Sequence, residues 1–247
     1  KRTAKFIGSC QREDGFIAGE RGGSMYDHGY ATLFLAEYSK ATGDAEARAK
    51  LVKAVELIVK AQGKEGGWRY LPAPADGDTS VSSCQVLALA AAGNAGVDVR
   101  RETIDAGVGF LKRCQNKDGG FPYVLPTAGS AFARSAAALA AALAASNATE
   151  PAHRPDTAAA TEYVMESLPK AGEPPKSGGF FIHGHYYAGQ ALRVAGGDTW
   201  KRWRDALREF LVASQKPDGS WAGEVAPELS TARSEEHTSE LQSPYVI

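Results

Sequence analysis

The sequence predicts an all-α protein built from about five helix hairpins. Three observations predict this fold class. A short segment recurs at near-constant spacing, the residues before each copy have a helical hydrophobic period, and the residues after it are apolar on nearly every side. The pattern therefore predicts an outer helix before each copy and an inner helix after it.

The recurring segment consists of a glutamine, a short polar turn with an acidic residue, one or two glycines and an aromatic residue. Its four glutamines are Gln11, Gln62, Gln115 and Gln215. Their separations are 51, 53 and 100 residues, so a degenerate copy is expected near Leu168. We expect the glycine to supply a left-handed conformation at the end of the outer helix, and the glutamine to bond orphan groups at helix ends.

Outer helices are predicted around residues 51–62 and 200–214, where apolar residues recur at i, i+3, i+4 and i+7 and charged residues lie opposite. Inner helices are predicted over residues 30–38, 81–92, 131–145 and 186–195. These stretches are rich in alanine, which lets neighbouring helices approach closely, and they have no polar stripe. Such alternation suits either an open solenoid or a closed ring.

The arrangement Gln-x-x-x-Gly-x-Trp at Gln215, Gly219 and Trp221 resembles the repeat of squalene and oxidosqualene cyclases. In looser form it is similar to the repeat of protein prenyltransferase β subunits and of bacterial proteins with prenyltransferase and squalene-oxidase repeats. The resemblance covers residues 1–232 and implies a closed α/α toroid with an apolar central cavity. It implies a ring of about five helix hairpins in this chain, an incomplete form of a six-hairpin barrel. It also implies that the N-termini of the inner helices surround one mouth of that cavity.

Residues 1–232 are therefore predicted to form one toroid domain that lacks its native C-terminus. Residues 233–247 resemble the translation of a common sequencing-adapter oligonucleotide, and we expect them to be non-biological and unstructured. The chain begins at Lys1 without a methionine, so cytoplasmic and exported locations both stay open.

The composition argues against several kinds of partner. The 28 Lys and Arg residues are balanced by 29 Asp and Glu residues, so there is no basic field for nucleic acid. The apolar run at 136–145 is too short for a membrane span, which needs about 20 residues. Cys10, Cys84 and Cys114 contain no CxxC pair, which predicts buried thiols rather than disulfides or a zinc ribbon. No cofactor is expected, and the oligomeric state is left open.

Polar residues at the starts of the inner helices are the site candidates. Asp76 and Asp78 are catalytic candidates because Asp76-Gly77-Asp78-Thr79 resembles the Asp-x-Asp-Asp-Thr-Ala run of squalene–hopene cyclases, whose middle acid protonates the substrate. The match places Asp78 on the last acid and Gly77 on the proton donor, which counts against cyclase chemistry. Alternatively, Asp78 or Thr79 caps an inner helix.

His183 is the third catalytic candidate, because residues 181–187 resemble the segment around the zinc-binding histidine of protein prenyltransferases. The other ligands of that family, an Asp and a Cys, have no counterpart in residues 129–135. A catalytic zinc site needs three protein ligands, so no metal site is expected. A substitute ligand set of acceptable chemistry would be His28, Asp78, His183 and His185.

Five more residues at inner-helix starts are predicted to bind ligand: Asp27, His28, Arg134, His185 and Tyr186. The alternative for the histidines is hydrogen bonding across inner helices. Aromatic side chains would either line a pocket that grips an isoprenoid or pack the turns. These aromatic residues are Phe16, Phe34, Trp68, Tyr70, Phe121, Tyr123, Phe180 and Phe181.

Three functions stay open, because a fold does not fix a function. The first is a terpene cyclase-like, mutase-like or prenyltransferase-like protein that handles an isoprenoid or other apolar ligand in a central cavity. The second is a non-catalytic toroid that binds a protein or lipid partner, which the missing donor acid and zinc ligands favour. The third is a polysaccharide lyase or hydrolase in which His183, Tyr186 and Arg134 move a proton.

Overall fold

The computed structural model describes residues 1–19, 23–125, 129–172 and 180–221. Within these ranges the chain forms nine α-helices and two short 3-10 helices, and its only extended pairing is an isolated bridge between Gln11 and Ile17. The fold class is therefore all-α, as predicted. The expected adapter-derived segment, residues 233–247, and the glycines of the degenerate copy, Gly178 and Gly179, lie outside the described residues.

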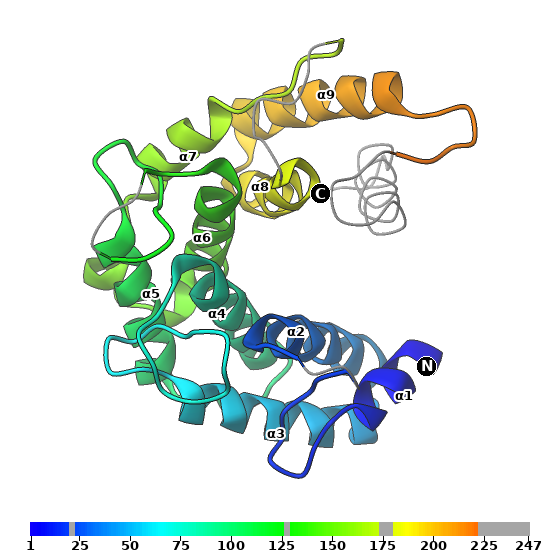
Figure 1. Cartoon of the computed structure of the whole chain (residues 1–247), viewed down its shortest axis with the longest axis vertical. Coiled ribbons are helices and arrows are strands. Elements are labelled where there is room, and N and C mark those ends of the chain that lie inside the picture. Colours follow the sequence, from blue (N-terminus) through cyan, green and yellow to red (C-terminus); the bar gives the residue numbers. More distant parts are fainter. Residues whose placement is uncertain (20–22, 126–128, 173–179, 222–247) are drawn as a thin grey trace.

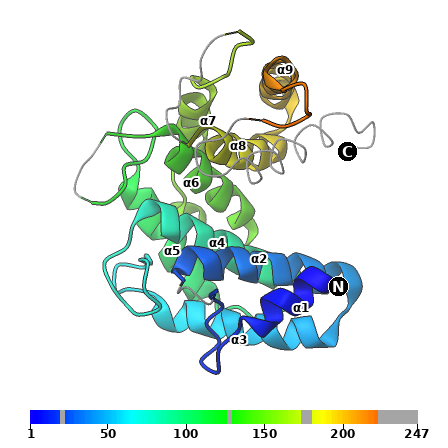
Figure 2. The same ribbon diagram turned by 45° about the vertical axis from the view of Figure 1, so that its right-hand side comes forward.

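The helices alternate between an outer and an inner layer of an arc (Figure 1). The outer helices are α1 (Arg2–Ser9), α3 (Ala45–Ala61), α5 (Arg101–Cys114), α7 (Thr157–Met165) and α9 (Gly197–Ser214). The inner helices are α2 (Met25–Thr42), α4 (Thr79–Asn94), α6 (Phe132–Ala144) and α8 (Phe181–Ala195). Each inner helix packs against the next one in the order α2, α4, α6, α8, and Figure 2 shows α2 and α4 side by side.

Burial follows this layering. Every residue from Val81 to Ala92 in α4 and from Ser135 to Ala142 in α6 is buried, so these helices are covered on all sides. The outer helix α3 buries one face only, which includes Leu51, Val55 and Ile58. No helix in the described ranges has the length and apolar character needed to cross a membrane.

The recurring glutamine ties its own turn to the next outer helix. In three copies, the side-chain Nε2 donates both to the glycine carbonyl four residues later and to a carbonyl about 40 residues later. The distant acceptors are Lys50 for Gln11, Thr103 for Gln62 and Asp156 for Gln115, at 2.8, 2.9 and 2.8 Å. Consecutive hairpins are therefore held together by the same bond.

The glycine of the turn has a different role from the one predicted. The C-cap residues of the outer helices α3 and α5 are Gln62 and Gln115, both in extended backbone, and not a left-handed glycine. Gly66 and Gly119 lie four residues later, with φ of 86° and 83°. At both sites, a Cβ would collide with a carbonyl of the next outer helix, so the turn needs glycine for its close approach as well as for its φ.

A second bond recurs between each turn and its inner helix. The amide N–H of Trp68 donates to Ser82 Oγ at 2.9 Å, and that of Phe121 donates to Ser135 Oγ at 2.8 Å. Ser82 and Ser135 both lie four residues after the N-cap of their helix. The N-terminal ends of the inner helices are thereby fixed against their own turns.

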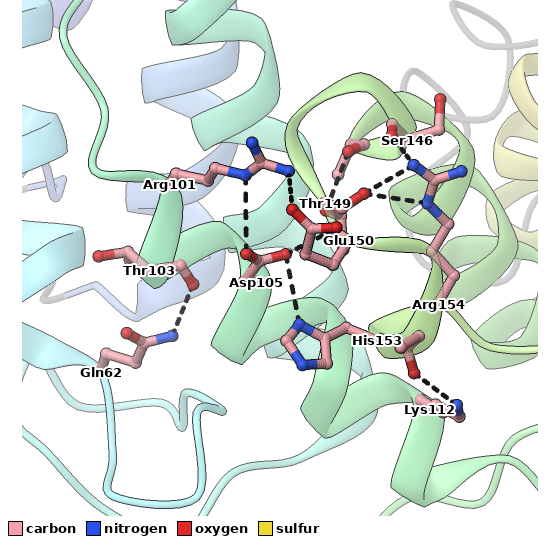
Figure 3. A network of polar contacts seen from close by, with 12 residues as sticks. Gln62, Arg101, Thr103, Asp105, Lys112, Ser146, Thr149, Glu150, His153 and Arg154 are labelled. Carbon is pink, nitrogen blue, oxygen red and sulfur yellow. Dashed lines mark hydrogen bonds and ion pairs between the residues drawn. The ribbon is translucent and has the colours of Figure 1, made fainter.

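The connection between α6 and α7 is held against α5 by a polar network on the outer layer (Figure 3). This connection contains the 3-10 helices η1 (Ser146–Ala148) and η2 (Pro151–His153). The Asp105 carboxylate accepts from the Glu150 amide at 2.9 Å, and Arg101 pairs with the Glu150 carboxylate at 2.5 Å. These groups are structural, and they lie in the layer remote from the inner-helix centre.

Candidate functional site

A cavity of about 220 Å³ lies where the N-terminal ends of the inner helices meet. Each inner helix contributes to its wall: Tyr26 comes from α2, Ser80 from α4, Arg134 from α6, and His183 and Tyr187 from α8. The inner-helix N-termini therefore share one mouth. A site here would be assembled from side chains of four different hairpins.

Two tyrosines from the connecting segments complete the mouth. Tyr70 and Tyr123 each lie eight residues after a recurring glutamine, and both line the cavity. The Tyr70 carbonyl accepts from the Met25 amide at 2.9 Å, and the Tyr123 carbonyl accepts from the Thr79 amide at 2.9 Å. Amide groups in the first turn of a helix lack intrahelical partners, so each connection both satisfies a helix end and places a tyrosine beside it.

The tyrosines and two arginines form one cluster. The hydroxyls of Tyr70 and Tyr123 are 2.7 Å apart. The Arg69 guanidinium lies 5.8 Å from the Tyr70 ring centre and 5.4 Å from that of Tyr123, while Arg134 lies 6.0 Å from the Tyr123 ring centre. Desolvation and the bond with Tyr70 raise the pKa of Tyr123, so its hydroxyl stays protonated. The mouth therefore combines aromatic surfaces with two positive charges.

Arg134 is the charged residue of the cavity wall. One of its terminal nitrogens donates to the Gly129 carbonyl at 3.3 Å. Its Nε is buried and has no hydrogen-bond partner among the described residues. A buried N–H of a charged group without an acceptor is unfavourable, so this side of the cavity suits a ligand that supplies an oxygen.

The two candidate aspartates lie outside the cavity wall. Asp76 is exposed on the connection before α4. Asp78 is fully buried and is the N-cap of α4, where its Oδ1 accepts from the Val81 amide at 2.8 Å. Burial raises the pKa of Asp78 in spite of that bond and of Arg69, whose Nε lies 3.8 Å from Oδ2. The contacts of Asp78 thus fit the alternative expectation, in which Asp78 caps an inner helix.

Asp27 and His28 support the fold of the first hairpin. Asp27 is exposed, and its carboxylate accepts from the Ser24 amide at 2.7 Å in a capping box. His28 is fully buried; its Nδ1 accepts from the Ile17 amide at 3.1 Å and its Nε2 donates to the Ala54 carbonyl at 3.0 Å. Burial lowers the pKa of His28 to about 4. Neither residue lines the cavity.

His185 and Tyr186 point to other surroundings than His183. His185 is buried among the rings of Phe132 and Phe181, whose centres lie 4.6 and 4.3 Å from its own. Tyr186 lines a second cavity of about 650 Å³ between α2 and α8. Of the eight residues predicted to be catalytic or ligand-binding, the first cavity therefore brings together only Arg134 and His183. Three of the aromatic candidates, Tyr70, Tyr123 and Phe180, also line it.

The substitute zinc ligands are not assembled. No three His, Cys, Asp or Glu side chains within the described ranges lie close enough to hold a metal ion. His28 is engaged by its two backbone partners, and Asp78 caps its helix. His28, Asp78, His183 and His185 thus do not form the metal set that the sequence left open.

Three residues of the cavity wall and the adjoining cluster were not predicted from the sequence as site residues: Tyr26, Tyr187 and Arg69. Tyr26 and Tyr187 are next to the predicted site residues Asp27 and Tyr186, and Arg69 follows the turn aromatic residue Trp68. A signal was present for Tyr187, because it lies four residues after His183 and so shares its helix face. The ring planes of His183 and Tyr187 are nearly perpendicular, and their centres are 5.0 Å apart.

Comparison with known sequences identifies a family but no characterised relative. The model of a family described as "Domain of unknown function (DUF6288)" matches residues 2–240. Among curated proteins, none matches the sequence.

Solved structures resemble the chain in fold. A variant of the type II terpene cyclase MstE from Scytonema, in complex with its substrate geranylgeranyl dihydroxybenzoate, has a TM-score of 0.68 at 15% identity, covering 99% of this chain and 73% of its own. A sugar epimerase from a ruminal bacterium has a TM-score of 0.67 at 12% identity, covering 96% and 82%. Salmonella alpha-2-macroglobulin reacted with methylamine has a TM-score of 0.55 at 17% identity, covering 96% and 16%.

These likenesses show the toroid fold alone, because the identities are low. They support the fold that the resemblance to squalene cyclases implied. They do not establish membership of the squalene cyclase family, and the terpene cyclase and the sugar epimerase leave the chemistry of this cavity open.

Proposed function

The chain belongs to the family of the domain of unknown function DUF6288, and we propose that it binds an isoprenoid-like ligand with an acidic head group in the cavity at the inner-helix N-termini. One observation carries the proposal. The wall of that cavity is mainly aromatic and apolar, and its charged residue, Arg134, has a buried Nε–H without an acceptor among the described residues. The terpene cyclase neighbour binds geranylgeranyl dihydroxybenzoate, which combines a hydrocarbon chain with an acidic ring.

The charge of the mouth favours an acidic group. Arg69 and Arg134 both lie beside the Tyr123 ring, and both lie close enough to Asp78 to lower its pKa, against the larger effect of burial. One buried carboxylate compensates one guanidinium at most. A carboxylate or phosphate is the natural partner for the remaining guanidinium, since its oxygens match the paired N–H donors.

The aromatic wall favours a hydrocarbon. Tyr26, Tyr123, Tyr187 and Phe180 present ring surfaces to the cavity, and the hydroxyl of Tyr123 is occupied by Tyr70. Ring faces bury apolar area and attract the weakly positive hydrogens of an aliphatic chain. The positions of the carboxylates do not favour cyclisation started by protonation, because Asp78 is behind the wall and Asp76 is exposed. Binding without cyclisation is also in keeping with the non-catalytic alternative.

The test is isothermal titration with farnesyl diphosphate and with farnesol, which lacks the anionic head. Removing one charge-assisted hydrogen bond weakens binding by about tenfold or more. Arg134→Gln should therefore lower the affinity for farnesyl diphosphate by that factor and change the affinity for farnesol little. Arg208→Gln is the matched control, because Arg208 is exposed on α9, and it should behave as the wild type.

Two results would contradict the proposal. If neither probe binds the wild type, the cavity is not an isoprenoid site. If Arg134→Gln weakens farnesol as much as farnesyl diphosphate while circular dichroism shows a folded protein, the guanidinium does not recognise the head group.

A second candidate is proton transfer on a sugar acid, and the grouping of Arg134, His183 and Tyr187 in one wall favours it. Arg134 would neutralise the carboxylate of the sugar acid. His183 would take the proton from the carbon beside that carboxylate, and Tyr187 would return a proton to the same carbon. Desolvation raises the pKa of Tyr187 well above its ordinary value, so its hydroxyl is protonated and able to donate. Tyr187 here replaces Tyr186, which was expected from the sequence to move the proton but lines the other cavity.

This candidate is tested by incubation with oligouronides in deuterated water, followed by mass spectrometry. Exchange of carbon-bound hydrogen for deuterium should occur with the wild type and with His153→Gln, a surface control, and disappear with His183→Gln. An absence of exchange and of cleavage with the wild type would remove the candidate.

A further inference from the structure

Two cavities among the described residues lie on either side of one pair of side chains, Tyr30 of α2 and Tyr187 of α8. We infer that this pair is the floor of the ligand cavity and sets the length of hydrocarbon that the site accepts. The inference rests on the proposed binding of an isoprenoid-like ligand.

The contact joins the first and last inner helices across the centre of the arc. The hydroxyls of Tyr30 and Tyr187 are 2.5 Å apart. Tyr187 lines the cavity that contains Arg134, whereas Tyr30 lines the second cavity together with Tyr186. The bonded pair therefore stands between the two spaces.

Tyr187 is the fixed member of the pair. It is 2% exposed, and its ring contacts His183 on one side and Tyr186 on the other, with centre separations of 5.0 and 5.4 Å. Tyr30 is only half-buried. Separation of the two hydroxyls is unfavourable for Tyr187, because its buried hydroxyl would lose this bond.

The volumes show why a floor would matter. Ligand pockets usually measure roughly 300–1,000 Å³. The cavity at the mouth, at about 220 Å³, lies below that range, and the second cavity, at about 650 Å³, lies within it. A long chain whose head group binds Arg134 would reach the second cavity by passing the tyrosine pair.

The second cavity has one apolar part of its wall that is suited to a hydrocarbon, and a polar part formed by Glu37, Gln190 and Arg193. Leu33 and Phe34 of α2 face Gly189 and Val194 of α8 across it. Removal of the Tyr30 ring would connect the first cavity with the second one. It would leave Arg134 and the wall of the first cavity in place. Head-group recognition and chain length can thus be separated by mutation.

The experiment measures the affinities of geranyl, farnesyl and geranylgeranyl diphosphates. The wild type should bind the longest probe no more tightly than the shortest. Tyr30→Ala should shift the ratio of the two affinities at least tenfold toward geranylgeranyl diphosphate, and Tyr30→Leu, which keeps more of the packing, should shift it in the same direction. Tyr38→Ala is the matched control, because Tyr38 lies on the same helix and outside both cavities.

The outcomes separate the two proposals. If the probes bind and neither Tyr30 variant changes the preference for chain length, the tyrosine pair is not the floor, and the proposed function stands. The same conclusion follows if Tyr38→Ala produces an equal shift. If no probe binds the wild type, the proposed function fails and this inference fails with it.

Discussion

Replacing Gln115 with alanine should destabilise the protein by about 2 kcal/mol, because each ordinary hydrogen bond contributes about 1 kcal/mol and water takes over part of the role at exposed sites. Gln115 makes three such bonds: its Nε2 donates to the carbonyls of Gly119 and Asp156 at 3.0 and 2.8 Å, and its Oε1 accepts from the Asp156 amide at 2.7 Å. Two of the three join one hairpin to the next. The loss is measured as a lower midpoint in urea unfolding followed by circular dichroism, with an unchanged m-value.

Gln215 supplies the matched control. Its side chain makes the bond within its own turn, to the Gly219 carbonyl at 2.9 Å, and no second bond to another outer helix is present in the described part of the chain. Gln215→Ala should therefore destabilise the protein by less than about 1 kcal/mol. Equal losses for the two variants, or a loss near zero for Gln115→Ala, would refute the view that the glutamine joins consecutive hairpins.

Three further outcomes are expected. In the native protein at pH 8, half-exposed Cys10 should react with a thiol reagent, whereas Cys84, whose pKa burial raises to about 12, and Cys114, whose pKa burial also raises, should react only after unfolding; fast labelling of all three would contradict their burial. Because the pKa of His28 falls from 6.5 to about 4 on folding, the contribution of His28 to stability should be complete well above pH 6.5 and fall by on the order of 3 kcal/mol between pH 6.5 and 4, as the unfolded chain takes up the proton. Urea unfolding across that range should show a flatter profile for His28→Gln, and identical profiles would disprove the assignment. Trp68→Ala should lower stability by about 3–5 kcal/mol, since the ring is fully buried, and a loss below 1 kcal/mol by the same assay would show that the turn aromatic is not part of the core.

The layering of the helices could be predicted from the sequence because it depends on local patterns. Apolar residues at helical spacing define the outer helices, and the alanine-rich stretches define the inner ones. The role of the turn glycine was predicted wrongly. Gly66 and Gly119 are needed because a carbonyl of the next outer helix, some 40 residues away, leaves no room for a Cβ, and a local pattern does not contain that contact.

The candidate site was harder to predict, because residue type and helix position do not specify which way a side chain faces. His28 lies four residues after an N-cap, as Ser82 does in the second hairpin, and both accept from the amide of a turn residue. Alignment of the hairpins would have shown this shared structural position. Arg69 and Tyr187 also contact residues of other hairpins, Tyr123 and Tyr30, and a local pattern does not contain such contacts.

The turn-binding position on each inner helix has a consequence for how such proteins diversify. His28, Ser82 and Ser135 anchor their hairpins from one face of the helix, while Tyr26, Ser80 and Arg134 meet the cavity from neighbouring positions. Substitutions at the wall positions can therefore alter the chemistry of one wall while the anchor residue of that hairpin is preserved. Proteins with this fold can therefore change their ligand specificity one hairpin at a time, with the fold preserved at each step.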